Sequence, residues 1–178
     1  MRTLDDLDAA DRRVLVRVDF NTPLTPAGPE GPARVADDTR IRAALPTIEE
    51  LRRKGARLVL VSHLGRPKDR APELSMRPVA DRLAELLSDA EVTLAPGVVG
   101  DEVKAFTESL LPGDVLMLEN VRYEPGETAN DPELARELAT LADAYVNDAF
   151  GAAHRAHAST AGVAQLLPAR PGACSSAR

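Results

Sequence analysis

Four apolar segments of this 178-residue chain are each followed directly by polar residues suited to binding an anion. Arginine can grip a carboxylate or phosphate with two hydrogen bonds, and histidine and asparagine add directional ones. In an open parallel sheet the carboxyl ends of the strands meet along one edge, where ligands bind. The sequence therefore predicts a pocket for a small, multiply negative molecule. Its candidate residues are Asp19, Asn21, Arg40, His63, Arg66, Arg122 and Arg155.

Arg40 is the candidate most at odds with its local setting. We expect it in the first turn of a helix, where the helix dipole disfavours a cation by a few tenths of a kcal/mol. A residue that goes against such a local preference, with no visible interaction to compensate for it, is more expected at a functional site than elsewhere. The alternative is a solvated surface arginine, since arginine is abundant in this chain, and Arg42 is better read in that way.

The other candidates also have structural alternatives. Asp19 and Asn21 precede a proline turn, where such side chains commonly bond their own backbone, although Asp19 could instead orient an arginine or accept from a substrate hydroxyl. His63 and Arg66 lie in SHLGRP, which could be an ordinary strand-to-helix loop.

Two further pairs of polar residues are not predicted to bind a ligand, and the motifs of a nucleotide site are missing. His154 and His157 have the spacing of a metal pair but lack a third ligand nearby, so we predict no metal site. Glu119 and Asn120 are expected to cap the turn that follows them. There is no glycine-rich phosphate loop and no dinucleotide fingerprint after a strand, so nothing in the chain reads as a nucleotide site.

The elements that position these residues alternate between strand and helix patterns, as in repeated βαβ units. We expect strands near 13–18, 57–62, 91–95, 114–119 and 143–147, mostly in near-continuous apolar runs typical of strands covered on both faces. Residues 24–36, rich in proline and glycine, are expected to form a loop. The fold class is α/β: a Rossmann-like parallel sheet with helices on both faces, in three layers.

Helices are expected near 38–54, 76–88, 101–110, 131–142 and 159–167. The first has an apolar face at Ile41, Ala44, Leu45, Ile48 and Leu51. Asp37 or Asp38 can cap it, Gly55 can end it and Pro46 should bend it. Ser159 is the expected cap of the last helix.

Composition sets further bounds. With 44% hydrophobic residues and 3% aromatic ones, the chain can form a full but aliphatic core, as one domain or one domain with a tail. Its net charge of −6 argues against a general nucleic-acid or membrane surface. No apolar run is long enough for a membrane span or a secretory signal, and the single Cys174 leaves no internal disulfide. A cytoplasmic monomer is expected.

Five segments, in this order, resemble the N-terminal domain of phosphoglycerate kinase: RVDFNTPL, DDTRIRAALPTI, SHLGRP, LENVRYEPGE and NDAFGAAHRAHAST. That family transfers a phosphoryl group between ATP, as a magnesium complex, and 3-phosphoglycerate, in glycolysis. Its N-terminal domain binds the phosphoglycerate, its C-terminal domain binds the nucleotide, and closure about a hinge brings them together. The resemblance implies the N-terminal half of a two-domain kinase, with Mg-ATP bound by the other half and no cofactor on this chain.

The resemblance places the substrate contacts on the seven residues already nominated. It implies that Arg40 stabilises charge on the transferring phosphoryl group and is catalytic, and that Asp19, Asn21, His63, Arg66, Arg122 and Arg155 hold the substrate. Thr22 stands where the family more usually has valine, a departure that we expect to be harmless.

The resemblance covers residues 1–169, and we expect residues 170–178 to be a tail foreign to the family. Family sequence near here would read AGRLLERE, whereas the chain reads RPGACSSAR. Codons ending in G or C for this tail, shifted by two bases, encode AGRLLERE. We therefore hypothesise a frameshift, in the gene or in its sequencing, and resequencing that found no in-frame nucleotide domain beyond the shifted base would refute it.

Three functional readings stay open. The first is a phosphoglycerate-kinase-like acceptor domain that is inactive alone, because phosphoryl transfer needs donor and acceptor positioned together. The second is a binding module, one half of a split kinase whose nucleotide-binding half is a separate chain. The third is a non-functional truncation product. A doubly wound domain with an unrelated anionic ligand is a weaker fourth reading.

Overall fold

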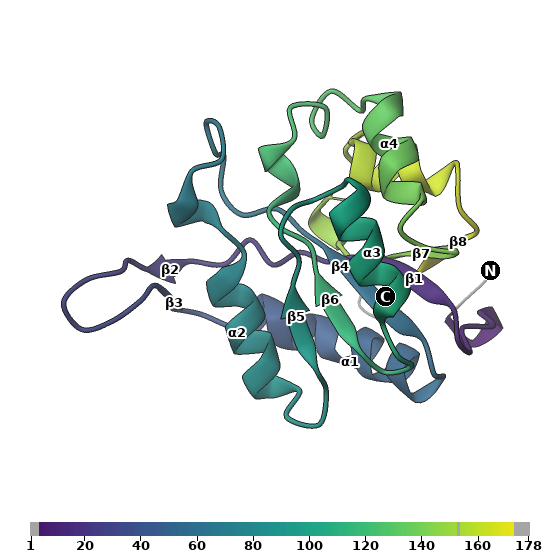
Figure 1. Ribbon diagram of the computed structural model, residues 1–178, viewed down its shortest axis with the longest axis horizontal. Coiled ribbons are helices and arrows are strands. Elements are labelled where there is room, and N and C mark those ends of the chain that lie inside the picture. Colours follow the sequence, from purple (N-terminus) through teal and green to yellow (C-terminus); the bar gives the residue numbers. More distant parts are fainter. Residues whose placement is uncertain (1–3, 153, 173–178) are drawn as a thin grey trace.

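A six-stranded, fully parallel sheet forms the centre of the computed structural model, which describes residues 4–152 and 154–172 (Figure 1). The strand order is β5-β6-β4-β1-β7-β8. The strands are β1 (Arg13–Arg17), β4 (Arg57–Val61), β5 (Val92–Leu94), β6 (Val115–Met117), β7 (Ala144–Asn147) and β8 (Ala169–Pro171). All five predicted strands are therefore present in the sheet.

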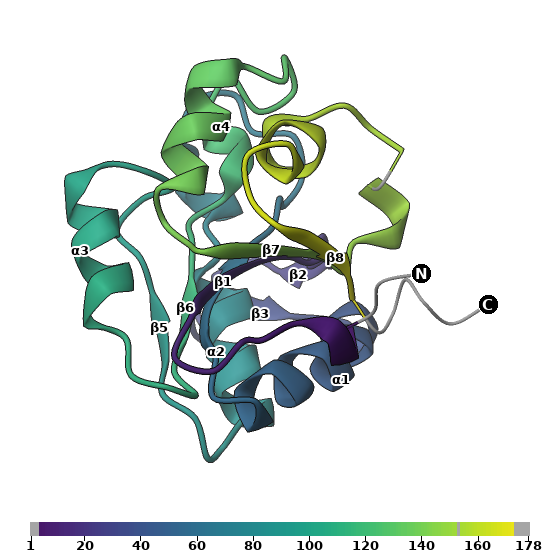
Figure 2. The ribbon, with the colours of Figure 1, turned by 90° about the vertical axis from the view of Figure 1, so that its right-hand side faces the viewer.

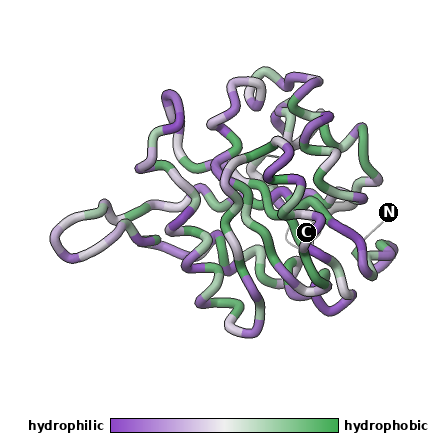
Figure 3. The backbone as a smooth tube through the Cα atoms, in the orientation of Figure 1, coloured by the Kyte–Doolittle hydropathy of each residue, from purple (hydrophilic) through white to green (hydrophobic). Residues whose placement is uncertain are grey.

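The central strands are apolar on both faces, which explains their near-continuous hydrophobic runs. Along β1, Val14 and Val16 belong to one core while Leu15 belongs to the other, because successive side chains point to opposite faces. β4 behaves in the same way. The hydropathy of the chain follows this arrangement, with apolar segments gathered in the middle of the molecule (Figure 3).

Helices cover both faces of the sheet (Figure 2). α1 (Thr39–Arg53) and α2 (Arg77–Leu86) contribute to one core, and α3 (Asp101–Ser109) and α4 (Pro132–Ala139) to the other. The predicted three-layer, Rossmann-like α/β architecture is confirmed. No helix among residues 4–152 and 154–172 combines the length and apolar character needed to cross a membrane.

α1 follows its predicted face, with Ile41, Ala44, Ile48 and Leu51 buried, and it continues through the exposed Pro46. Asp38 occupies the N-cap position, but its side chain makes no capping hydrogen bond. The backbone N–H of Thr39 donates to Oδ1 of Asp37 at 2.9 Å. Gly55 follows the helix with φ of +79°, and its N–H bonds to the carbonyl of Arg52.

Three parts of the predicted organisation need correction. The loop over residues 24–36 contains a short antiparallel ribbon of β2 (Leu24–Thr25) and β3 (Arg34–Val35), which projects from the body of the molecule in Figure 1. β8 was not predicted at all. The helix expected at 159–167 begins instead as a π-helical turn, η5 (Ala158–Gly162), whose N-cap is His157. Ser159 is not its cap but a fully buried residue within it.

Candidate functional site

A cavity of about 340 Å³ lies at the edge of the sheet where β1, β4, β6 and β7 end. Its lining includes all seven residues nominated from the sequence, namely Asp19, Asn21, Arg40, His63, Arg66, Arg122 and Arg155. These residues are far apart in the chain and come together because parallel strands deliver their following loops to one edge. The predicted convergence is therefore present.

Arg40 and Asp19 form an ion pair across the cavity. Arg40 lies at the second position of α1, as expected, and its Nη1 donates to both carboxylate oxygens of Asp19 at 2.9 Å. Asp19 also accepts from the backbone N–H of Asn21 at 3.3 Å. Both readings of this aspartate are thus realised, since it bonds its own backbone and orients a neighbouring arginine.

The backbone of Gly65 connects two of the converging loops. Its N–H donates to Oδ1 of Asn21 at 2.9 Å, and its carbonyl accepts from Nη1 of Arg122 at 2.9 Å. Gly65 has a φ of +59°, and an added Cβ would lie 3.0 Å from a methyl carbon of Leu74. Glycine is therefore favoured at this position, because it adopts the left-handed backbone without strain and leaves the side chain of Leu74 in place.

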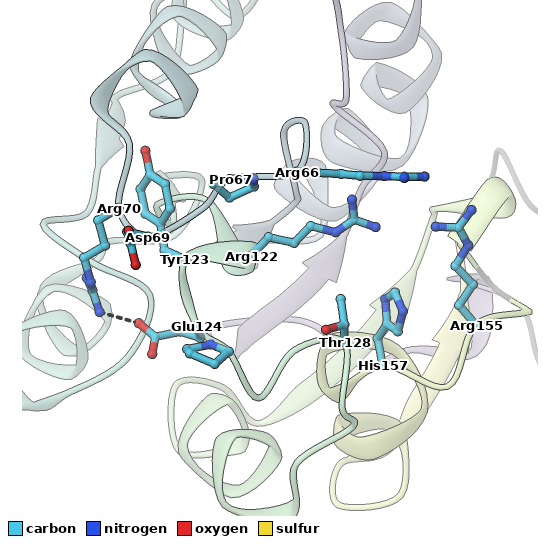
Figure 4. Close-up of a pocket in the computed structure, with 11 residues that line it drawn as sticks. Arg66, Pro67, Asp69, Arg70, Arg122, Tyr123, Glu124, Thr128, Arg155 and His157 are labelled. Carbon is cyan, nitrogen blue, oxygen red and sulfur yellow. Dashed lines mark hydrogen bonds and ion pairs between the residues drawn. The ribbon is translucent and has the colours of Figure 1, made fainter.

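Three arginines line both this cavity and a wider neighbouring one of about 730 Å³. Figure 4 shows the guanidinium groups of Arg66, Arg122 and Arg155 directed toward the same space, with His157 beside them. Burial lowers the pKa of Arg122, and the nearby positive charge of Arg155 lowers it further. Their crowding favours an anionic occupant, because an anion would relieve the repulsion.

The sequence reasoning missed Arg17, which ends β1 and lines the same cavity although only 1% of its surface is exposed. Its Nη2 lies 3.0 Å from Nδ1 of His63. Burial, followed by the charges of Arg17 and Arg122, lowers the pKa of His63 to about 3. His63 is therefore neutral at physiological pH. The signal that could have identified Arg17 is an arginine directly after the apolar run 14–16 of a strand that is buried.

Gly151, Ala152 and His157 also line the cavity and were not predicted to do so. Glu119 and Asn120 are structural, as predicted. The Asn120 amide is completely buried, donates to the carbonyls of Leu64 and Leu74, and accepts from the N–H of Arg122. Across residues 4–152 and 154–172, no cluster of three or more His, Cys, Asp or Glu side chains could hold a metal ion.

Comparison with known proteins gives a consistent result. A family model described as "Phosphoglycerate kinase" matches residues 4–176. The chain belongs to the phosphoglycerate kinase family. A phosphoglycerate kinase of Desulforudis audaxviator is 56% identical over 172 residues, covering 96% of this chain and 42% of that protein. A phosphoglycerate kinase of Moorella thermoacetica is 59% identical over 171 residues, with the same coverage.

Solved structures agree with the sequence comparison. Phosphoglycerate kinase from Coxiella burnetii superimposes with a TM-score of 0.82 at 36% identity, covering 97% of this chain and 42% of that one. The enzyme from Pyrococcus horikoshii gives a TM-score of 0.86 at 29% identity and covers 98% of this chain and 43% of that one. The family resemblance is thus confirmed in both sequence and fold.

The match has a definite extent along both chains. The 178 residues span about 42% of the length of these relatives. The family match reaches residue 176, beyond the predicted end of family sequence at 169. The boundary near residue 170 and its frameshift explanation remain predictions, and residues 173–178, with Cys174 among them, lie outside the described residues.

Proposed function

We propose that the cavity binds 3-phosphoglycerate and that the chain is the acceptor half of a phosphoglycerate kinase. The observation that carries this proposal is the lining of the cavity, where five arginines and a neutral histidine surround a single carboxylate in a chain of this family. The arginines are Arg17, Arg40, Arg66, Arg122 and Arg155. A ligand with both a phosphate and a carboxylate matches such a cluster, because guanidinium groups pair with each of them.

The energetics are consistent with useful affinity. A charge-assisted hydrogen bond contributes about 1.5–3 kcal/mol. Three or four such bonds to one small ligand give micromolar binding after the entropy of association is subtracted. The carboxylate of Asp19 is available to accept from a substrate hydroxyl while it keeps Arg40 in place.

In the proposed reaction, ATP as its magnesium complex donates a phosphoryl group to the carboxylate of the bound 3-phosphoglycerate. Arg40, held by Asp19, would stabilise the charge that develops on the transferring group, and Asn21, His63, Arg66, Arg122 and Arg155 would hold the acceptor. Such transfer depends almost entirely on positioning and on electrostatic stabilisation.

We assign no nucleotide or magnesium site to these residues, and we expect no phosphoryl transfer by this chain alone. Proximity of donor and acceptor can supply about 7–11 kcal/mol of a barrier, and that contribution needs a second, nucleotide-binding half. We also propose that the protein is cytoplasmic and monomeric, and that it binds neither nucleic acid nor a membrane.

Calorimetric titration tests the acceptor site directly. We expect saturable binding of 3-phosphoglycerate, weaker binding of inorganic phosphate, and no binding of Mg-ATP. Equal affinity for phosphate and 3-phosphoglycerate would reduce the site to a general anion site and contradict the proposal.

A complementation assay tests the half-enzyme reading. The chain should give no ADP from ATP and 3-phosphoglycerate until the remaining C-terminal segment of the Moorella thermoacetica relative is added. Turnover restored by that segment would support a binding module that works with a second chain. Turnover by this chain alone would refute our assignment of function.

A further inference from the structure

Behind the cavity lies a continuous row of buried polar side chains. Glu127 is 1% exposed, Ser159 is 0% exposed, Arg17 is 1% exposed, and His63, at the wall of the cavity, is 9% exposed. A buried carboxylate is costly unless it is hydrogen-bonded and opposed by positive charge. Glu127 was not among the residues nominated from the sequence, and it does not line either cavity.

Ser159 links the carboxylate to the arginine. Its backbone N–H donates to Oε2 of Glu127 at 2.9 Å, and its hydroxyl donates to Oε1 of the same carboxylate. The hydroxyl oxygen in turn accepts from Nε of Arg17 at 2.9 Å. Because a guanidinium has no acceptor, the hydroxyl proton must point toward Glu127, and the direction of this row is fixed.

The same reasoning fixes the proton on His63. Nη2 of Arg17 lies 3.0 Å from Nδ1 of His63, and Arg17 can act there only as a donor. Nδ1 must therefore be the unprotonated nitrogen. A neutral imidazole carries its single proton on the other nitrogen, so Nε2–H is the donor that His63 offers to a ligand.

We propose that Glu127, acting through Ser159 and Arg17, is a positioning residue that sets His63 in the tautomer with Nε2–H as its donor. This inference rests on the proposed function, since its consequence is the binding of an anionic substrate in the cavity. Glu127 touches no substrate in this scheme. It supplies the negative charge that opposes the buried Arg17, and it accepts both donors of Ser159.

Glu127→Gln is the sharpest test because it keeps the shape and removes the charge. A glutamine has one oxygen in place of two, so one donor of Ser159 would face an amide that cannot accept. The backbone carbonyl of Glu127, which accepts from the N–H of Ala158 at 3.0 Å, is untouched by the change. A loss of order in the whole loop is therefore not expected.

Two readouts together distinguish positioning from mere stabilisation. The chain has three histidines, so ring nitrogen NMR is simple, and signals lost in His63→Gln belong to His63. In the free wild-type chain we expect an unprotonated Nδ1 and a protonated Nε2. In Glu127→Gln we expect that preference to weaken or reverse, and the Kd for 3-phosphoglycerate to rise at least tenfold.

Two further variants complete the design. Ser159→Ala breaks the link but keeps the carboxylate, and should change both readouts in the same direction; it serves as the test if Glu127→Gln does not fold. Glu133→Gln removes an exposed carboxylate on α4 that pairs with Arg136, and should change neither readout.

Several results would overturn the proposal. It fails if the free wild-type chain carries the proton on Nδ1, or if folded Glu127→Gln and Ser159→Ala keep both the tautomer and the affinity. Lost affinity with an unchanged tautomer would make Glu127 a structural residue only. The tautomer is measured without ligand, so a wild-type chain that shows the predicted tautomer but does not bind 3-phosphoglycerate would refute the proposed function and not the positioning of His63.

Discussion

At the scale of single residues, the cavity concentrates cations at short range. Five arginines line it, and Asp19 is the one carboxylate among the described lining residues. Arg122 shows the consequence, because burial and then Arg155 lower its pKa. Repulsion among these cations should cost stability, and a bound anion should recover it. We therefore expect anion binding and stability to be opposed at this site.

Arg155→Ala separates these two effects. Arg155 is exposed and lines both cavities. The loss of one charge-assisted contact, about 1.5–3 kcal/mol, should raise the Kd for 3-phosphoglycerate about 10- to 100-fold. Relief of repulsion should leave Tm unchanged or raise it. Calorimetric titration and a thermal melt measure the two quantities.

Arg12→Ala is the matched control for that change. Arg12 is an exposed arginine that pairs with Asp8, away from the cavity lining. It should leave the Kd unchanged. Wild-type affinity in Arg155→Ala would show that this arginine does not hold the ligand.

His63 predicts a pH dependence of stability. Its pKa is about 3 in the folded chain and about 6.5 in the unfolded chain, so between these values the unfolded state binds more protons. The contribution of His63 to the free energy of unfolding is therefore fully present above pH 6.5 and is lost as the pH falls from 6.5 toward 3. From pH 7 to pH 5 the loss is about 2 kcal/mol at most.

His63→Gln isolates this contribution from that of other titrating groups. Urea unfolding between pH 5 and 7 should show a shallower slope of stability against pH in His63→Gln than in wild type. Identical slopes in wild type and His63→Gln would contradict a neutral, buried His63.

Thr22 gives a prediction about stability alone. Its side chain is buried, and its hydroxyl oxygen has no hydrogen-bond partner. Thr22→Val replaces the unsatisfied hydroxyl by a methyl group of similar shape, so the free energy of unfolding should rise by about 1 kcal/mol. Tm should rise by about 2–4 °C, with the Kd for 3-phosphoglycerate unchanged. A lower Tm would show that the hydroxyl has a stabilising contact after all.

At the scale of elements, the five strands and four helices with strong periodic patterns were predictable from the sequence. β8 was not, because Ala169, Arg170 and Pro171 have no strand pattern; they join the sheet by pairing with β7 at its edge, where proline is tolerated. The helix cap predicted at Ser159 was wrong because a distant carboxylate, Glu127, binds that residue. Local rules carry no information about such partners.

The candidate site followed from the sequence to the extent that its residues stand directly after strands. Arg17 was missed because it is part of β1 and does not follow it, and Glu127 because it lies well beyond the end of β6, in the loop between the 3-10 turn Val121–Tyr123 and α4. Their roles depend on burial and on contacts with residues that are distant in the chain. Sequence spacing does not reveal either property.

Asp131 tests whether α4 depends on its cap. Its carboxylate accepts from the N–H of Leu134 at 3.1 Å, and Pro132 begins the helix. Asp131→Ala should lower the free energy of unfolding by about 1 kcal/mol. Asp131→Asn keeps an accepting oxygen and should lose only a few tenths of a kcal/mol, as measured by urea unfolding. Equal losses in both variants would show that the cap is not what the aspartate contributes.

At the scale of the whole molecule, the positive charge is local. The chain carries a net charge of −6, yet one edge of its sheet gathers five arginines. Such a field attracts a small anion to the cavity without making the surface generally adhesive to polyanions. This arrangement fits a metabolite site better than a nucleic-acid surface.

The measurement that tests the central claim most directly is a thermal melt of the purified chain with and without millimolar 3-phosphoglycerate, with Mg-ATP as the control. A ligand that binds only the folded state adds about 2.7 kcal/mol at a hundredfold excess over its Kd, or about 5–10 °C in Tm for a chain of this size. We predict one cooperative transition, raised by 3-phosphoglycerate and not by Mg-ATP. A cooperative transition that 3-phosphoglycerate leaves unmoved, or the absence of any such transition, would contradict a folded acceptor site.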